Sequence, residues 1–255
     1  MNKFSMLKKL TVAAVLTLVL MLSSSLALAA DKVLIVVTSH DTLGNSSEKT
    51  GYWLGEVTHP YQKLQQAGFD VEIASILGGE APVDARSLAD KDPVNDWFMA
   101  DNKHKNKLKN TRKLSELQAK DYKAVLFAGG HGTMWDFPSD KALARLAADI
   151  YQQNGVVAAV CHGPAALLNI KLANGDYLIN GKKLTGFSNT EEAAVKLTDV
   201  VPFSLEDELV KRGGRFEKAA DWQVKVVADK RLVTGQNPQS AAEVGHVVVQ
   251  LLTAK

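Results

Sequence analysis

The chain of 255 residues has only one cysteine, Cys161, and a formal net charge of only +2. A single cysteine cannot form a disulfide within the chain, and it also excludes a Cys-x-x-Cys redox motif and a cysteine zinc cage. The near balance of charge gives no indication of a nucleic-acid-binding surface. Gly-x-Gly-x-x-Gly and Walker motifs are absent as well, so we expect no nucleotide cofactor.

The histidines also lack the spacing of common metal sites. They are His40, His59, His104, His131, His162 and His246. No two of them form His-x-x-x-His or His-Glu-x-x-His, the helical patterns that place two imidazoles on one metal ion. We therefore expect no catalytic metal.

The N-terminus has the layout of a secretory signal peptide. Three lysines lie within residues 1–9, an apolar run follows at 10–22, and residues 23–30 are small with an Ala-x-Ala cleavage site. An uncleaved anchor is the alternative, but the apolar run is too short to span a bilayer comfortably. We expect residues 1–29 to be removed and the remainder to be periplasmic or secreted, without membrane association.

From residue 32 onward, apolar β-branched segments alternate with helical patterns. We predict strands at 32–38, 69–75, 123–128, 156–160, 183–185, 222–227 and 232–234. We predict helices at 50–67, 141–153, 205–212 and 240–252, and another that begins at 164. This alternation indicates a flavodoxin-like, doubly wound α/β fold, in which helices cover both faces of a mainly parallel sheet.

We expect residues 30–255 to form one domain with a polar excursion at about 78–120. The excursion is rich in charge and should contain one or two short helices, and its basic run at 103–109 is typical of a solvated helix face. Pro60 predicts a kink or a late start in the helix at 50–67. Ser240 is expected to cap the last helix.

The single cysteine follows the buried strand 156–160 at an abrupt turn, in the segment Val-Val-Ala-Ala-Val-Cys-His-Gly-Pro. A residue at such an elbow is strained, with its side chain exposed at the rim of the sheet. Gly163 permits close backbone approach, and Pro164 suits a first helical turn. The positive end of that helix would lower the thiol pKa. We expect Cys161 to be an ionised nucleophile; the alternative is an inert core cysteine.

Several motifs carry a resemblance to a known family. Ala-Val-Cys-His-Gly-Pro-Ala is preceded by Gly-Gly-His-Gly-Thr-Met-Trp-Asp-Phe-Pro and by an early Thr-Gly-Tyr-Trp-Leu-Gly-Glu-Val-Thr-His-Pro-Tyr. It is followed by Leu-Thr-Gly-Phe-Ser-Asn-Thr-Glu-Glu and Leu-Val-Thr-Gly-Gln-Asn-Pro-Gln-Ser-Ala. From Lys32 to the last helix, the chain resembles the ThiJ/PfpI superfamily, whose fold is like that of class I glutamine amidotransferases. The resemblance is to the branch of heat-shock-type chaperones and glyoxalase III enzymes.

The resemblance implies a set of catalytic residues. Cys161 matches the nucleophile and His162 the catalytic histidine. The acid that orients the histidine matches Glu192, with Glu191 as a close competitor in the same block. A further glutamate, which contacts the thiol in the family, matches Glu56.

The family's oxyanion pocket, also implied by the resemblance, falls on the backbone amides of Gly130, His131 and His162. For His131 we favour this backbone role over a side-chain role. A carboxylic acid that touches a thiolate must be largely protonated, because two adjacent anions in a poorly solvated pocket repel each other. Glu56 would then donate a hydrogen bond to Cys161.

The implied reaction converts methylglyoxal, a small 2-oxoaldehyde, to lactate without glutathione, metal or other cofactor. Cys161 would attack the aldehyde carbon to give a hemithioacetal. His162 or Glu56 would move a proton between the adjacent carbons through an enediol, and water would hydrolyse the resulting thioester. Dimers are frequent in the family, so a homodimer is expected.

Three other functions fit parts of the sequence. A glutamine amidotransferase needs a late His-x-Glu motif, whereas His246 is followed by two valines. A PfpI-type cysteine peptidase usually takes its acid from across an oligomer interface, which Glu192 would make unnecessary. A holdase chaperone or thiol stress sensor would use an exposed, oxidisable Cys161.

Overall fold

The computed structural model describes residues 30–89 and 91–254, and the predicted signal peptide lies outside this part. Asp31–Lys255 forms one compact unit. Its main sheet has seven strands in the order β3-β2-β1-β4-β5-β9-β8. They are β1 (Lys32–Val37), β2 (Asp70–Ser75), β3 (Arg112–Lys113), β4 (Ala124–Phe127), β5 (Val156–Val160), β8 (Val226–Asp229) and β9 (Leu232–Gly235). Only the β8–β9 pair is antiparallel in this sheet, which confirms the prediction of a mainly parallel sheet.

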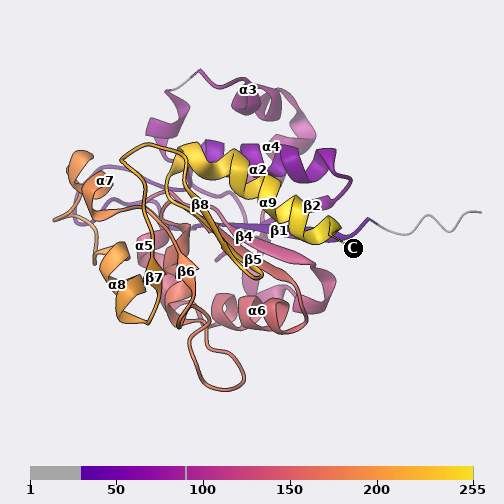
Figure 1. Ribbon diagram of the computed structural model, residues 1–255. Helices are drawn as coiled ribbons and strands as arrows, with labels where there is room; N and C mark the ends of the chain where they lie inside the picture. The colour runs from indigo at the N-terminus through magenta and orange to yellow at the C-terminus, as the bar shows by residue number, and fades with distance from the viewer. Residues whose placement is uncertain (1–29, 90, 255) are drawn as a thin grey trace, which may run out of the picture. The chain divides into compact units, whose positions relative to one another are not determined.

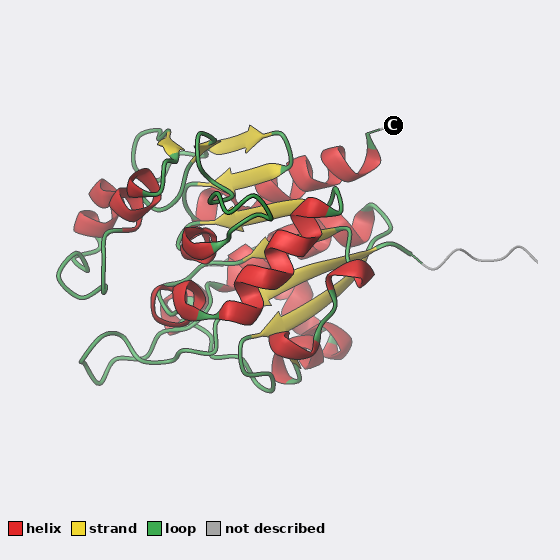
Figure 2. Cartoon of the chain, turned by 90° about the horizontal axis from the view of Figure 1, so that it is seen from below, coloured by secondary structure: helices red, strands yellow, loops and turns green. Residues whose placement is uncertain are grey.

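Helices cover both faces of the sheet (Figures 1 and 2). The α-helices among the described residues are α2 (Leu54–Gln66), α3 (Pro93–Ala100), α4 (Asn102–Lys109), α5 (Thr133–Asp136), α6 (Lys141–Gln152), α7 (Asn189–Ala194), α8 (Leu205–Lys211) and α9 (Ala241–Thr253). Helices α2 and α9 pack against each other on one face, and α6 lies on the opposite face (Figure 1). The predicted doubly wound α/β architecture is therefore confirmed.

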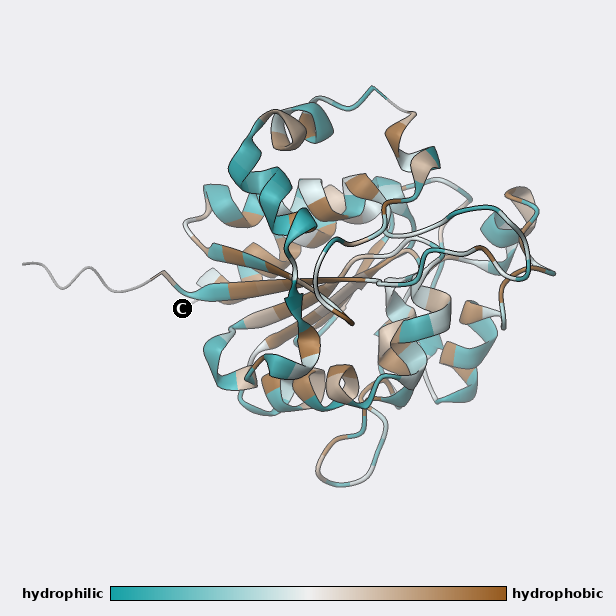
Figure 3. Cartoon of the chain, turned by 180° about the vertical axis from the view of Figure 1, so that it is seen from behind, coloured by the Kyte–Doolittle hydropathy of each residue, from teal (hydrophilic) through white to brown (hydrophobic). Residues whose placement is uncertain are grey.

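The central strands are buried along their length because both faces of the sheet are covered. Every residue of β4 and β5 is buried, as are five of the six residues of β1. Near-continuous apolar sequence is what parallel strands require in this position. The strands accordingly form the hydrophobic centre of the protein in Figure 3.

The polar excursion contains two short α-helices, α3 and α4, where one or two were predicted. Asp92 caps α3 through its side chain, and Pro93 occupies the first turn, where no amide donor is needed. In α4 only His104 and Leu108 are buried, while the lysines are exposed or half-buried. The basic run is therefore a solvated helix face, as predicted.

Two predicted boundaries are wrong for local reasons. Helix α2 begins at Leu54 because Tyr52 bridges to Val83 and the Trp53 amide donates to the Gly129 carbonyl. The predicted strand at 222–227 begins only at Val226, because Trp222 has a φ of +63° that a strand cannot accommodate.

Two other expectations are also corrected. The strand predicted at 183–185 forms β6 (Lys183–Leu184), but it pairs with β7 (Arg215–Phe216) in a separate small sheet. Ser240 precedes α9 without capping it, because its hydroxyl donates to Asn237 Oδ1 and accepts the Lys225 amide.

Within residues 30–89 and 91–254, no helix combines the length and apolar character that crossing a membrane requires.

Candidate active site

Cys161 lies at a strained elbow directly after β5, as predicted. Its φ is +59°, a left-handed conformation that is costly for a residue with a side chain. Two backbone hydrogen bonds hold it there: its amide donates to Gly235, and its carbonyl accepts from Phe187. A Cβ on Gly163 would lie 2.2 Å from the Phe127 carbonyl oxygen, so only glycine fits this turn.

The thiol is not exposed at the rim of the sheet, which corrects one expectation. Cys161 is only 3% exposed and lies in the wall of a pocket of about 180 Å³. Gly130, His131 and His162 line the same pocket. The structure therefore brings the nucleophile together with all three residues predicted for the oxyanion pocket.

The expected low thiol pKa is also wrong. Burial raises the pKa of Cys161, and ionisation of Glu56 at alkaline pH would raise it further. The segment that follows, Gly163–Asn169, is a 3₁₀ helix of seven residues rather than a longer α-helix. The resting sulfur is therefore a neutral thiol, and its proton must leave as it attacks.

His162 is placed to take that proton. Its Nδ1 lies 3.3 Å from Cys161 Sγ, and its Nε2 lies 2.8 Å from Glu192 Oε2. An ionised carboxylate can only accept, so Nε2 carries the hydrogen and Nδ1 presents its lone pair to the thiol. The structure thus connects Cys161, His162 and Glu192 in one chain of hydrogen bonds.

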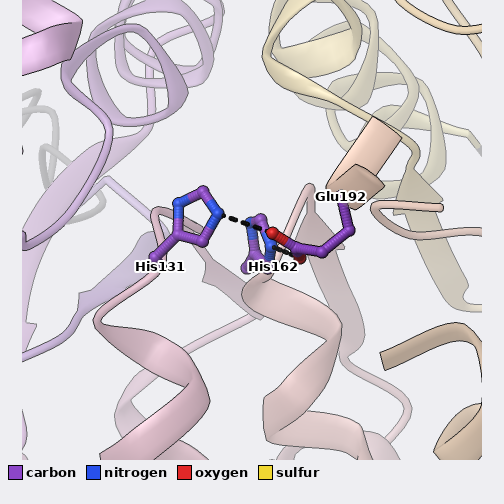
Figure 4. A group of neighbouring side chains, drawn as sticks. All are labelled: His131, His162 and Glu192. Atoms are coloured by element: carbon purple, nitrogen blue, oxygen red, sulfur yellow. Dashed lines mark hydrogen bonds and ion pairs between the residues drawn. The ribbon is translucent and has the colours of Figure 1, made fainter. Parts of the chain in front are cut away.

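Glu192 also holds a second histidine (Figure 4). Its Oε1 lies 3.0 Å from His131 Nε2, and the Arg86 guanidinium donates to His131 Nδ1 at 3.2 Å. Because a guanidinium only donates, Nδ1 must be the acceptor and Nε2 must carry the hydrogen. From the sequence, only a backbone role was expected for His131. Its position after β4, beside the strand that leads to Cys161, is the feature that indicates a side-chain role as well.

Burial and neighbouring groups shift the pKa values of Glu192 and His131. Burial opposes ionisation of Glu192, but His162 and the hydrogen bonds from both imidazoles keep its pKa well below the ordinary value. Burial, together with the neighbouring His162, lowers the pKa of His131 to about 4. At neutral pH, Glu192 is therefore a carboxylate and His131 a neutral donor.

Glu56 occupies the first turn of α2 and is fully buried beside the thiol. Its Oε2 accepts the Gly129 amide at 2.7 Å, while Oε1 makes no such bond within the described residues. Burial raises its pKa to about 8, so the carboxyl is protonated at neutral pH. The proton belongs on Oε1, since Oε2 is already an acceptor, and it is available to Cys161.

Glu191, the competitor of Glu192, points elsewhere. It forms a capping box with Ser188 at the start of α7. Its Oε1 accepts the Trp222 amide at 3.0 Å and the Asn237 side chain at 2.9 Å. The geometry therefore assigns contact with His162 to Glu192 and leaves Glu191 as an anchor for other segments.

His131, His162 and Glu192 also resemble a metal-ligand set, since their ligand atoms lie within 4.8 Å of one another. Both Nε2 atoms, however, carry hydrogens that they donate to Glu192. A metal at His131 Nε2 would require the proton to move to Nδ1, against the Arg86 donor. The donor set thus fits acid–base chemistry better than metal coordination.

Comparison with known proteins agrees with this geometry. A family model described as DJ-1/PfpI family matches residues 49–251. Glyoxalase 3 of Candida albicans is 34% identical, over 86% of this chain and 97% of that protein. A glutathione-independent glyoxalase of Saccharomyces cerevisiae is 35% identical, over 84% of this chain and 94% of that protein.

Solved structures show the same similarity. The 24 kDa rapid encystment protein of Francisella tularensis superposes with a TM-score of 0.85 at 50% identity, covering 87% of this chain and 99% of that one. The crystal structure of glyoxalase III from Candida albicans superposes with a TM-score of 0.81 at 32% identity, covering 87% of this chain and 97% of that one.

Proposed function

This chain belongs to the DJ-1/PfpI family, and we propose that it is a glutathione-independent glyoxalase. It converts methylglyoxal or related small 2-oxoaldehydes to 2-hydroxy acids without a cofactor. The observation that carries this function is the continuous contact from Cys161 through His162 to Glu192 beside a small pocket. Relatives that match most of the chain bear the same activity in their names.

The first step forms a bond between Cys161 Sγ and the aldehyde carbon. His162 Nδ1 takes the thiol proton during the attack, since a neutral thiol is a poor nucleophile. The aldehyde oxygen gains the negative charge, and the amides of Gly130, His131 and His162, which line the pocket with Cys161, would stabilise it. Protonation by His162 then gives a hemithioacetal.

The second step transfers hydrogen within the substrate. His162 removes the proton from the former aldehyde carbon, and the resulting enediol is reprotonated on the neighbouring carbon, with protonated Glu56 as a second proton donor in the site. Oxidation of one carbon and reduction of the other balance, so no external oxidant is needed. Water then hydrolyses the thioester and releases the 2-hydroxy acid and the Cys161 thiol.

A direct assay tests this function. Residues 30–255 should convert methylglyoxal to lactate in glutathione-free buffer, and Cys161→Ala should abolish the conversion. A matched variant at an exposed apolar position, Val210→Ala, should retain it. Absence of lactate with the wild-type protein would overturn the assignment.

The alternative functions have weaker support. An acid from within the chain, Glu192, completes the site, whereas the peptidase alternative expects one from a partner. The large exposed apolar side chains are Leu77, Leu88, Met99, Val210, Trp222 and Val224. Only Trp222 and Val224 among them share a loop, and a thiol that is 3% exposed is poorly placed as a sensor.

We also propose that the enzyme acts outside the cytoplasm and as a homodimer. The charge and hydropathy layout of residues 1–29 supports export. Mass spectrometry of the mature N-terminus tests cleavage before residue 30, and light scattering of the purified protein tests the dimer. A retained leader or a monomer would contradict the respective proposal.

A further inference from the structure

The part of the pocket that the chemistry above does not use is aromatic. Phe187 packs against the His162 ring at a centroid distance of 4.4 Å, and Trp222 packs against Phe187 at 5.8 Å. Trp53 and Val195 complete this apolar wall. A continuous aromatic surface therefore leads from the catalytic histidine to Trp222, which is 39% exposed.

Trp222 is held in place against a local cost. Its φ of +63° is unusual for a bulky residue, and such strain persists only where the surroundings impose it. Its amide donates to Glu191, which is completely buried, and Asn237 bonds both Glu191 and the Gln223 carbonyl. The preceding Asp221 accepts the Thr190 hydroxyl. Several independent contacts thus hold the backbone of this loop, and the indole packs against Phe187 at the pocket.

The two adjacent glutamates of α7 consequently have different tasks. Glu192 orients the imidazole that moves protons, whereas Glu191 holds the loop that carries the aromatic wall. Strain and buried polar contacts devoted to an exposed tryptophan indicate a role in ligand contact, because the fold itself gains little from them.

The pocket extends from Cys161 to Trp222 and has a volume of about 180 Å³. A three-carbon aldehyde bound to Cys161 would leave the surface of Phe187 and Trp222 without a partner. Apolar surface of this kind is favourably covered by an apolar or aromatic group.

Resting on the proposed glyoxalase function, we propose that the preferred substrates are 2-oxoaldehydes with an aromatic substituent on the keto carbon. The ring packs against Trp222 and Phe187 while the aldehyde carbon reaches Cys161. The sulfur of Cys161 bonds to the aldehyde carbon. The hydrogen of that carbon then moves to the keto carbon, which gives a thioester, and water cleaves the thioester. Phenylglyoxal plus water gives mandelate, with one carbon oxidised and its neighbour reduced.

Steady-state kinetics with phenylglyoxal and methylglyoxal test this preference. The value of kcat/KM should be about tenfold higher for phenylglyoxal, and the difference should lie mainly in KM. Trp222→Ala should reduce the ratio of the two values about tenfold, and Trp222→Phe should retain most of it. Because phenylglyoxal also modifies arginine and Arg86 lines the pocket, only initial rates are measured, so that the exposure is short.

Val224→Ala is the matched control, because Val224 is an exposed apolar residue of the same loop that does not line the pocket. Its ratio should equal that of the wild type. A wild-type preference for methylglyoxal, or an unchanged ratio in both Trp222 variants, would overturn the substrate preference and leave the glyoxalase function intact. Lack of turnover with both aldehydes would overturn the glyoxalase function itself.

Discussion

Arg86 donates a hydrogen bond to His131 Nδ1, and this contact determines which nitrogen of His131 carries the proton. Arg86 is itself held by the buried carboxylate of Asp84. The second imidazole nitrogen then donates to Glu192, which also receives the hydrogen of His162. One carboxylate is thereby fixed from two sides, and His162 keeps its lone pair directed at the thiol.

Replacement of His131 should show whether this donor matters. His131→Gln can place an amide donor near the position of Nε2, whereas His131→Leu has similar bulk without a donor. We expect kcat for methylglyoxal to fall about tenfold or more in the Leu variant and severalfold less in the Gln variant, since a misoriented base is inefficient. Equal losses in both, at equal Tm, would contradict a hydrogen-bonding role.

The two glutamates of α7 should differ sharply on substitution. Glu192→Gln replaces an acceptor of two imidazole hydrogens by a group that also donates, so kcat should drop by about 10²–10⁴-fold. Glu191→Gln leaves one acceptor oxygen for donors that now bind two, at both the capping box and the Trp222 loop, and should lower the unfolding free energy by about 1–3 kcal/mol. Thermal melts and lactate assays on both variants provide the check. A larger loss of kcat in Glu191→Gln than in Glu192→Gln would contradict the assignment.

Cys161 should react slowly with alkylating agents at neutral pH. Burial raises its thiol pKa, so the rate of modification by iodoacetamide should increase only above the range in which free cysteine ionises, about pH 8.5. The rate measured against pH in substrate-free protein provides the check. A half-maximal rate below pH 7 would instead show a thiolate that exists before substrate binds.

Ionisation of the Glu56 carboxyl should lower the activity at alkaline pH. Its pKa is raised to about 8, and its ionised form places a negative charge beside the sulfur. The value of kcat/KM should therefore decline as pH rises through about 8. Glu56→Gln imitates the protonated carboxyl and should flatten the alkaline decline of kcat/KM. A decline with the same midpoint and steepness in the variant would show that another group causes it.

The same pKa shift affects stability. The unfolded chain loses the Glu56 proton near pH 4.5, whereas the folded protein keeps it to about pH 8. The contribution of Glu56 to stability is thus fully present below pH 4.5 and is lost as pH rises toward 8. At pH 7, Glu56→Gln should stabilise the protein by on the order of 3 kcal/mol, measured by urea unfolding. At pH 4, the difference should vanish.

The elbow glycine provides a structural test. A Cβ at position 163 would overlap the Phe127 carbonyl, and backbone atoms cannot move aside cheaply. Gly163→Ala should lower the unfolding free energy by about 1–3 kcal/mol and reduce activity by displacing Cys161. Gly175→Ala offers a comparison in open space, although its own φ of +86° adds a backbone cost. A Gly163 variant as stable as the wild type would show that the turn is more tolerant.

Local patterns in the sequence were sufficient for much of the fold. The apolar runs of β1, β4 and β5 predicted covered parallel strands because their composition reflects burial on both faces. Composition also predicted one or two short helices in the excursion, which contains α3 and α4. Trp222 shows the limit: its residue type favours a strand, but contacts with Glu191 impose a turn.

By itself, the sequence determined the parallel α/β fold, the strained position of Cys161 after β5 and the presence of His162 beside it, since each depends on neighbouring residues in the chain. Only the tertiary structure decided that Glu192 rather than Glu191 meets His162, that the His131 side chain and Arg86 support it, and that the thiol is buried and neutral. These properties depend on distances and solvent exclusion among distant segments, and neither residue type nor spacing specifies them.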